Sequence, residues 1–357
     1  MPSKVAVMKT TPEKVVDDYS KLMRSCNYQK YLPRKKKTVL KINLSWSLYY
    51  PACSTEPWQL EGVLKTLRED GYDDIVAMEH KTVVTNIAKG LVGNRWQPVL
   101  DKYDVEFVPL PDVKWVEYDS IVKSDLPAIK AIFGKTHRIP EPLIGTNILH
   151  LPTIKTHGHT TITGAVKNAF GGLITTRRHH SHKIIHEVLV DLLKIQKEIH
   201  TGMFVAMDGT VCGDGAGPRT MDPVIKNYIL AGDDSVAIDA VSAKMMGFNP
   251  ADIKFIAMAD RLKLGNGQMK NIRIVGEDIS NVNFGFHTNE SFVIMWDKLF
   301  RKGRFRFVEP MLFHTKLFKL AVFGSAFYHD HLWYPLAGKK RIKKFMKTEW
   351  GDKFRQY

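Results

Sequence analysis

The sequence predicts an α/β fold with a mainly parallel sheet, helices on both of its faces, and a basic, aromatic C-terminal extension. The first observation behind this prediction is a strand–helix–strand unit: the apolar run Val39–Leu44, the amphipathic helix Trp58–Asp70 and the second apolar run Ile75–Met78. A unit of this length joins parallel strands. The second observation is that short apolar runs and amphipathic segments keep alternating as far as residue 276.

Local signals mark the boundaries of these elements. Ser54 or Thr55 can cap the helix that follows, Pro57 fits its first turn, and Gly71 ends it. Elsewhere, apolar runs bounded by proline or glycine indicate strands, and apolar residues spaced by three and four indicate helices. Further strands are expected at Val105–Pro109, Asn147–Pro152, Met203–Met207 and Ile272–Gly276, and further helices at Thr11–Cys26, Ile184–Ile199 and Asp234–Met246.

The 357 residues divide into three parts by composition. Residues 1–37 are expected to form an N-terminal arm that ends in a basic linker, residues 38–285 the α/β core, and residues 286–357 a basic C-terminal extension. With 44% hydrophobic and 25% charged residues, the chain can bury a sizeable core, which argues against disorder.

The net charge of +15 is concentrated near the C-terminus, where residues 301–357 carry 14 Lys and Arg against 4 Asp and Glu. This excess favours an anionic partner, either a small anionic ligand or an anionic membrane surface. Aromatic and basic residues are mixed in Leu312–Phe327 and Lys339–Lys344, as in a helix that lies in a membrane interface. Equally, the aromatic rings can pack on the core while the lysines face water. Nucleic acid is not the expected partner, because no stacking motif of a known module is present.

The three cysteines, Cys26, Cys53 and Cys212, are far apart and form no C-x-x-C pair. A disulfide framework and a cysteine-ligated metal or iron–sulfur site are therefore not expected, which suits a reducing, cytoplasmic location. The N-terminus shows no apolar leader, and no run approaches 18 apolar residues, so neither a cleaved signal nor a spanning helix is expected.

A polar segment follows the strand expected at Asn147–Pro152 and holds the first candidate site. It contains Lys155, His157 and Lys167, whose side chains act as acids, bases or electrophiles in enzymes. In an open α/β sheet, ligands bind at the carboxyl ends of strands. The alternative is a surface loop whose side chains cap helices and bind water. Further side chains of this segment that are expected to contact a ligand are His159, Thr160, Thr163 and Asn168.

A segment rich in histidine and arginine comes next. Arg177 and Arg178 would suit a carboxylate or a phosphate. His182 and His186 are four residues apart, which puts them on one face of a helix and permits a shared metal ion. No suitable acidic ligand stands beside them in the sequence, so a ligand-facing basic loop is the better interpretation and no metal is expected.

The third segment follows the strand Met203–Met207. Asp208 at the end of this strand is a candidate acid, or it caps its own turn. The glycines after it, among them Gly215 and Gly217, are expected to form a tight loop that lets a ligand approach the backbone. Lys41 on the first core strand indicates either a charge required at the end of the strand or an edge face.

Together these segments resemble the core motif of the family catalogued as domain of unknown function 362. Many members carry a ferredoxin-like cysteine cluster near the C-terminus; this chain lacks those cysteines, so the resemblance does not imply electron transfer here. The resemblance spans roughly residues 38–280 and rests on the runs Lys41–Leu44, Thr55–Pro57, Lys155–Gly172, Asp208–Pro218 and Asp233–Gly247.

A more distant likeness is to the lactate racemase family, which uses a nickel-pincer nucleotide. In that family a histidine precedes the lysine that tethers the cofactor and another histidine follows, an order that His157, Lys167 and His182 share. The Lys167–Asn168 pair is not the usual context in that family. The sequence by itself therefore identifies no cofactor, and it does not predict the oligomeric state.

Two functions follow as hypotheses. In the first, the chain is an enzyme that acts on a small anionic metabolite in a cleft at the strand ends. In the second, it is a non-catalytic ligand-binding or membrane-peripheral protein that acts through its basic, aromatic C-terminal region. The first requires its catalytic candidates to converge on one pocket. Those candidates are Lys155, His157, Lys167 and Asp208, and the residues expected to hold the ligand are His159, Thr160, Thr163, Asn168, Arg177, Arg178, Gly215 and Gly217.

Overall fold

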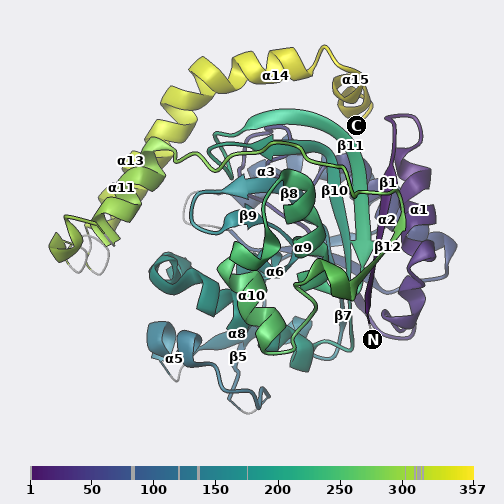
Figure 1. The fold of residues 1–357 in the computed structure, drawn as a ribbon, viewed down its shortest axis with the longest axis horizontal. Coiled ribbons are helices and arrows are strands. Elements are labelled where there is room, and N and C mark those ends of the chain that lie inside the picture. The colour runs from purple at the N-terminus through teal and green to yellow at the C-terminus, as the bar shows by residue number, and fades with distance from the viewer. Residues whose placement is uncertain are drawn as a thin grey trace.

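One mixed, mostly parallel sheet of ten strands organises the fold (Figure 1). The computed structural model describes residues 2–81, 85–119, 121–134, 137–174, 176–301, 303–308, 311, 315 and 317–357, with the side chains of 176–179, 292 and 306 excepted. The strand order is β12-β1-β11-β10-β7-β2-β3-β4; β8 pairs with β10, and β9 pairs with β8. The α/β class and the mainly parallel sheet expected from the sequence are confirmed.

The sheet strands are β1 (Ser3–Lys9), β2 (Thr38–Lys41), β3 (Ile75–Glu79), β4 (Glu106–Pro109), β7 (Asn147–His150), β8 (Thr153–His157), β9 (Thr161–Thr163), β10 (Gly202–Asp214), β11 (Asp222–Gly232) and β12 (Ile272–Gly276). A separate ribbon pairs β5 (Trp115–Glu117) with β6 (Arg138–Pro140). The α-helices are α1 (Val15–Ser25), α2 (Pro57–Glu69), α3 (Ile87–Gly93), α4 (Trp96–Lys102), α5 (Pro127–Phe133), α6 (Ala165–Asn168), α7 (Phe170–Leu173), α8 (Ile185–Ile199), α9 (Ser235–Met246), α10 (Lys254–Arg261), α11 (Phe292–Arg301), α13 (Phe318–Ala326), α14 (Lys339–Phe345) and α15 (Glu349–Arg355). Two other helical segments matter below, the 3-10 segment η5 (Thr176–Ile184) and the π-helical segment η9 (Phe327–Gly338).

The strand β2 lies in the parallel part of the sheet. It pairs in parallel with β3 and with β7, and all four of its residues are buried. Because these three strands run in the same direction, their last residues meet at one edge of the sheet. Those residues are Lys41, Glu79 and His150.

The N-terminal and glycine-rich segments differ from the sequence-based expectation. The sequence predicts an arm over residues 1–37, but β1 lies inside the sheet between β11 and β12. It also predicts a loop after Asp208, yet β10 continues through Asp214 and pairs antiparallel with β11. The glycines of β10 let neighbours approach the strand closely, since a Cβ at Gly213 would lie 2.0 Å from the Met221 sulfur.

The start of α2 also differs in detail. Neither expected cap residue caps it: Glu56 and Gln59 form a reciprocal capping box. The Thr55 hydroxyl instead accepts a hydrogen bond from the Asn43 backbone N–H at 2.8 Å and donates to the Leu151 carbonyl at 2.7 Å. Thr55 therefore ties the loop before α2 to the ends of two neighbouring strands.

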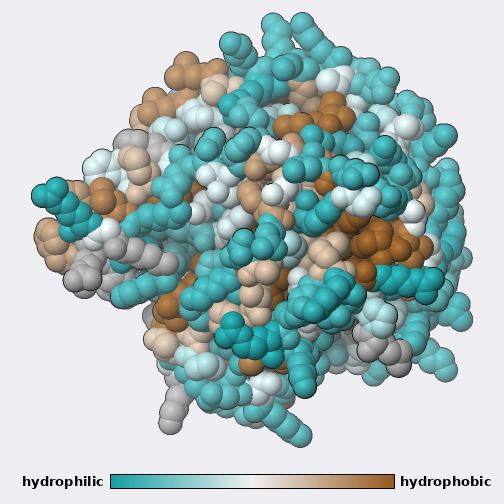
Figure 2. All heavy atoms as spheres, viewed as in Figure 1, coloured by the Kyte–Doolittle hydropathy of each residue, from teal (hydrophilic) through white to brown (hydrophobic). Residues whose placement is uncertain are grey.

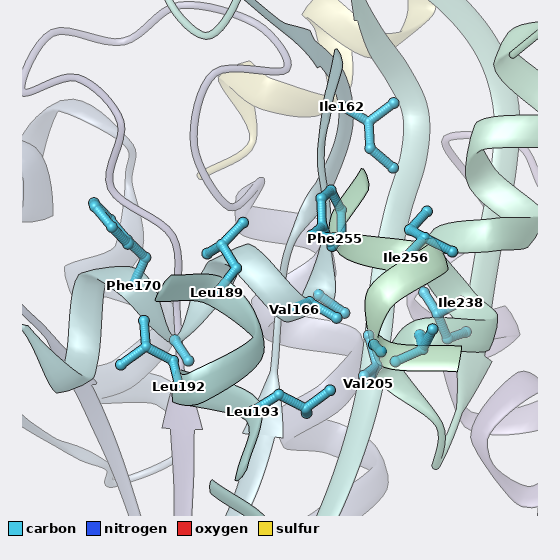
Figure 3. Close-up of a cluster of buried hydrophobic side chains, with 14 of the residues drawn as sticks. Ile162, Val166, Phe170, Leu189, Leu192, Leu193, Val205, Ile238, Phe255 and Ile256 are labelled. Atoms are coloured by element: carbon cyan, nitrogen blue, oxygen red, sulfur yellow. The ribbon is translucent and has the colours of Figure 1, made fainter. Parts of the chain in front are cut away.

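Helices cover both faces of the sheet, as the sequence predicts. On one face α6, α8, α9 and α10 form a hydrophobic cluster in which Val166, Leu189 and Phe255 lie near Val205 of β10 (Figure 3). On the other face α1, α2 and α4 bury a second cluster around Trp58. Fully burying side chains of this size stabilises the fold by about 1.5–3 kcal/mol each.

The C-terminal segment leaves the core and returns to it. Figure 1 shows α11 and α13 as an arm at the upper left, from which the chain continues across the top to α14 and α15. Near its end, Trp350 is buried and its indole N–H donates to Asn227 Oδ1 at 2.7 Å. Within the described ranges, no helix combines the length and apolar character needed to cross a bilayer.

Candidate functional site

A cavity of about 680 Å³ lies between the carboxyl ends of the parallel strands and the C-terminal segment. The core elements supply mostly polar lining, whereas α11 and α13 supply mostly apolar lining. The cavity therefore has two chemically different sides. Its polar lining includes Lys41, Glu79, His157, Thr163, Lys167 and Asn168, and its apolar lining includes Val293, Ile294, Trp296, Phe300, Phe318 and Val322.

A buried ion pair lines the polar side. Lys41 Nζ lies 2.7 Å from Glu79 Oε1, and the two side chains are 2% and 3% exposed. Lys41 also donates to the Ile42 carbonyl at 2.8 Å, while Glu79 Oε2 accepts the Leu44 backbone N–H at 2.9 Å. The sequence leaves open whether Lys41 marks a strand end or an edge face; it stands at the carboxyl end of a strand paired on both sides.

Thr163 and Asn168 each present a buried polar atom that has no hydrogen-bond partner among the described residues. Asn168 Nδ2 donates to the Lys41 carbonyl at 2.8 Å, but Asn168 Oδ1 has no such partner. The Thr163 hydroxyl is in the same situation. An unmet polar group in a protein interior costs about 1–3 kcal/mol, and both atoms belong to residues that line the cavity, so a small rearrangement on ligand binding could satisfy them.

His157 is a neutral hydrogen-bond donor at this site. Its Nδ1 accepts the His159 backbone N–H at 3.1 Å, which leaves the ring proton of the neutral imidazole on Nε2. Burial, reinforced by the nearby Lys167 charge, holds the pKa of His157 well below its ordinary value. At neutral pH the ring therefore keeps one N–H and carries no charge.

The short helix α6 brings Lys167 and Asn168 to the cavity, and Asp239 holds that helix in place. The Asp239 carboxylate accepts the backbone N–H groups of Ala165 at 2.6 Å and Val166 at 3.1 Å. A Cβ at Gly164 would lie 2.0 Å from Asp239 Oδ1, so only glycine fits beside this contact. Burial raises the pKa of Asp239 to about 7.

Lys155 does not line the cavity. Its ammonium donates to Asn43 Oδ1 and the Cys53 carbonyl, both at 2.8 Å, and to Thr153 Oγ1 at 2.5 Å. These three acceptors use all three of its N–H donors. Burial lowers the pKa of Lys155 to about 8. Lys155 therefore supports Asn43, a residue of the cavity lining, through a hydrogen bond but does not line the cavity itself.

Asp208 is likewise separate from the cavity, on the face of the sheet that α1 and α2 cover. Its Oδ2 accepts hydrogen bonds from the Tyr19 hydroxyl at 2.9 Å and the Trp58 indole at 3.1 Å, and its Oδ1 accepts the Thr210 backbone N–H at 3.1 Å. Burial raises its pKa to about 6. Of the four catalytic candidates, the structure thus brings His157 and Lys167 together and separates Lys155 and Asp208 from them.

The expected ligand-holding residues are divided in the same way. His159, Thr163, Asn168 and Gly217 line the cavity. Thr160 is buried in the β8–β9 turn, where its hydroxyl donates to the Ile162 carbonyl at 2.9 Å. Gly215 lies in the left-handed region at φ 91° and is not part of the lining. The side chains of Arg177 and Arg178 lie outside the described residues.

One group of the described residues has the spacing of a metal site, although the sequence predicts no metal. His159 Nε2 and His182 Nδ1 lie 3.5 Å and 3.8 Å from Asp297 Oδ2. The same carboxylate accepts a hydrogen bond from Arg301 Nε at 2.9 Å. Burial lowers the pKa of His159 to about 4; the Asp297 carboxylate opposes this shift, and the positive charges of Lys298, Lys167 and Arg301 add to it. Three positive charges thus stand beside the single Asp297 carboxylate, which disfavours a bound cation.

Several lining residues were not identified from the sequence. Glu79 could have been identified as a candidate site residue, because it directly follows the carboxyl end of the predicted strand Ile75–Met78. No sequence pattern indicated three other lining residues, because they belong to the C-terminal segment and reach the cavity only through tertiary packing. These residues are Asp297, Tyr328 and His329.

A family model, a relative and a solved structure are similar to this chain. The family model described as a domain of unknown function (DUF362) matches residues 38–244. The thylakoid-associated protein sll1697 of Synechocystis sp. (strain ATCC 27184 / PCC 6803 / Kazusa) is 24% identical over 217 residues, which are 59% of this chain and 63% of that protein, so the match spans less than two thirds of the relative. A crystal structure of a protein from Thermotoga maritima aligns with a TM-score of 0.37 at 12% identity, over 58% of this chain and 52% of that one.

Proposed function

We propose that this chain, which belongs to the family described as a domain of unknown function (DUF362), is an enzyme that acts on a small anionic molecule carrying an apolar portion. The observation that supports the proposal most directly is that Thr163 and Asn168, which line the same cavity as Lys167 and His157, each have a buried polar atom without a hydrogen-bond partner among the described residues. Convergent polar groups in an otherwise apolar cavity are typical of a ligand site.

The core elements would hold the anionic group. Lys167 supplies a positive charge, and His157 supplies an N–H donor that stays neutral at physiological pH. Thr163 and Asn168 add uncharged hydrogen bonds that orient the ligand. The Lys41–Glu79 pair is satisfied internally and adds no net charge, so the anion would be recognised mainly by Lys167 and its neighbours.

The C-terminal elements would hold the apolar portion. Ile294 and Phe300 of α11 and Val322 of α13 line the other side of the cavity. Burying apolar ligand surface against them stabilises the complex by about 25 cal/mol per Å². The ligand we propose is therefore amphipathic rather than a fully polar metabolite.

The chemistry we propose is proton transfer next to the anionic group. Lys167, bound as an ammonium, would donate its proton to the ligand as a general acid and become a neutral amine, and the neutral His157 would donate a hydrogen bond to the anionic group. A neutral imidazole suits this second role better than that of a base, because its low pKa makes it a weak proton acceptor. Reduced, buried Cys26, Cys53 and Cys212 are compatible with a cytoplasmic setting for this activity.

Binding is tested with alkyl carboxylates and alkyl phosphates of increasing chain length. Thermal shift and calorimetry measure the affinity for each compound. We expect affinity to rise about fourfold for each added buried methylene, as about 0.8 kcal/mol per methylene implies. Lys167→Gln should lose the preference for anions, whereas the exposed Lys270→Gln, outside the cavity, should bind like wild type. Equal anion affinity in both variants would contradict the assigned binding site.

Catalysis is tested separately with the best-binding anion. Wild type and Lys167→Gln are incubated with it, and mass spectrometry follows its conversion. We expect turnover by wild type only. If wild type binds a series of anions and converts none of them, the chain is a binding protein and the catalytic half of the proposal is wrong.

A further inference from the structure

The exposed apolar side chains of this chain are unevenly distributed. Of the twelve large hydrophobic residues exposed among the described residues, nine lie between Met295 and Leu336. Figure 2 shows apolar residues in brown at the upper left, where Figure 1 places the C-terminal arm. On α13, η9 and the residue before them, these exposed side chains are Leu317, Leu320, Phe323, Phe327, Leu332 and Leu336.

The helix α13 presents apolar side chains on two opposite faces. Leu320 and Phe323, with Phe327 at the start of η9, follow one another at spacings of three and four, and they are 65%, 67% and 46% exposed. Phe318, which precedes Leu320, and Val322, which lies between Leu320 and Phe323, line the cavity. The inner face is therefore occupied by the cavity, and the outer face cannot be buried by rotating the helix toward the core.

The packing of η9 holds this outer face in place. Trp333 and Tyr334 pack against the buried Trp46, with ring centroids 5.9 Å and 5.1 Å away. The only acidic residue between 317 and 347, Asp330, accepts a hydrogen bond from the Trp46 indole at 2.6 Å. The one negative charge of this segment therefore lies on the side that packs against the core, where it accepts a hydrogen bond.

Positive charge follows the apolar face directly. Residues 317–347 contain seven Lys and Arg and one Asp, a net charge of +6. Five of the basic side chains are exposed lysines on α14 or just after it. They are Lys339, Lys340, Lys343, Lys344 and Lys347.

We propose that the outward face of residues 317–347 docks on the surface of an anionic lipid bilayer. Leu320, Phe323 and Phe327 would enter the boundary between head groups and acyl chains, and the lysines of α14 would contact anionic head groups. An exposed apolar face beside a basic run is the combination that binds such surfaces in the plane of the membrane. This proposal is independent of the reaction proposed for the cavity.

Charge selects a bilayer over a second copy of this chain. Two copies joined through this face would bring two segments of charge +6 together, within molecules that each carry +15. Like charges in such proximity oppose association. An anionic bilayer complements both properties of the face at once.

The test is flotation of the full chain with two kinds of vesicle. One kind contains phosphatidylcholine alone, and the other also contains about 30 mol% phosphatidylserine. We expect wild type to float with the anionic vesicles. Leu320→Gln/Phe323→Gln should lose binding by about tenfold or more. Lys340→Gln/Lys343→Gln/Lys344→Gln should lose about 100-fold on anionic vesicles, from about fivefold per lysine.

The control variant is Val92→Gln/Leu262→Gln, which removes two exposed apolar side chains far from this segment in the sequence and should bind like wild type. Circular dichroism checks that each variant is folded. Wild type that stays with the aqueous fraction, or apolar variants that float like wild type, would overturn the proposal. So would a native mass that falls from dimer to monomer in Leu320→Gln/Phe323→Gln, since the face would then join two copies. Anion binding in the cavity of these variants reports on the proposed reaction separately.

Discussion

Breaking the Lys41–Glu79 ion pair should destabilise the fold far more than removing both charges together. The two side chains are 2% and 3% exposed and their charged atoms lie 2.7 Å apart, so neither charge can reach water when its partner is removed. Lys41→Met leaves a buried carboxylate, and Glu79→Gln leaves a buried ammonium. Each single variant is expected to lose about 3–5 kcal/mol of unfolding free energy.

The double variant Lys41→Met/Glu79→Gln should lose only about 1–3 kcal/mol. It leaves no unpaired charge. The Glu79 carboxylate accepts the backbone N–H groups of both Leu44 and His80, and the one amide oxygen that Glu79→Gln introduces replaces only one carboxylate oxygen, so the cost is mainly that of one lost hydrogen bond. The coupling energy of the cycle is therefore expected to be about 3 kcal/mol or more. Urea denaturation at pH 7, followed by circular dichroism, measures all four proteins.

An exposed pair provides the matched control. Lys114 Nζ lies 2.8 Å from Glu141 Oε1, about as close as in the buried pair, but their side chains are 70% and 47% exposed. A cycle on this pair should give a coupling of about 0–1 kcal/mol, because water screens both charges. If the Lys41–Glu79 variants are additive to within about 0.5 kcal/mol, the argument from burial is refuted.

Three further predictions concern buried side chains, two of them at the support of α6 and one at Asp208 away from the cavity. Gly164→Ala places a Cβ only 2.0 Å from Asp239 Oδ1, so the two groups clash. The melting temperature measured by thermal shift should fall, and anion binding should weaken because Asp239 holds α6 in place. Because burial raises the pKa of Asp239 from 3.8 to about 7, the folded chain binds a proton there that the unfolded chain releases, and this group makes stability fall by up to about 4 kcal/mol as pH rises from 4 to 7. Asp239→Asn should remove that fall from urea-derived stabilities, and an unchanged pH dependence would count against it. Tyr19→Phe removes one of the donors to the buried Asp208 and should cost about 1.5–3 kcal/mol in the same assay, whereas a loss below 0.5 kcal/mol (roughly the experimental error) would mean that Asp208 does not depend on this bond.

Much of the core could be predicted because its signals are local. The helix predicted at Trp58–Asp70 is observed at Pro57–Glu69, and the strand predicted at Ile75–Met78 is observed at Ile75–Glu79. The apolar spacing in each segment depends only on residues a few positions apart. The expected position of a site, at the carboxyl ends of parallel strands, needed only the order of the elements and the handedness of their connections.

The candidate site was predicted only in part, because burial does not distinguish a ligand-binding group from a supporting one. Lys155 and Lys167 lie in the same polar segment, yet Lys155 is fully buried and satisfied by three acceptors whereas Lys167 lines the cavity. Asp208 follows a strand as a catalytic acid often does, but its side chain lies on the face covered by α1 and α2 and contacts Tyr19 and Trp58. Side-chain direction along a strand alternates, so a shift of one residue moves a group to the other face.

Residue periodicity and motif order were enough to establish the α/β class, the family and the segments from which the polar lining comes, since both are properties of neighbouring residues. The packing of whole elements was needed to show that residues 286–357 complete the cavity and that the outer face of α13 stays exposed. The contact between His159 and Asp297 joins positions more than a hundred residues apart. Such contacts depend on how helices and strands meet in space, and no local pattern in the chain records that arrangement.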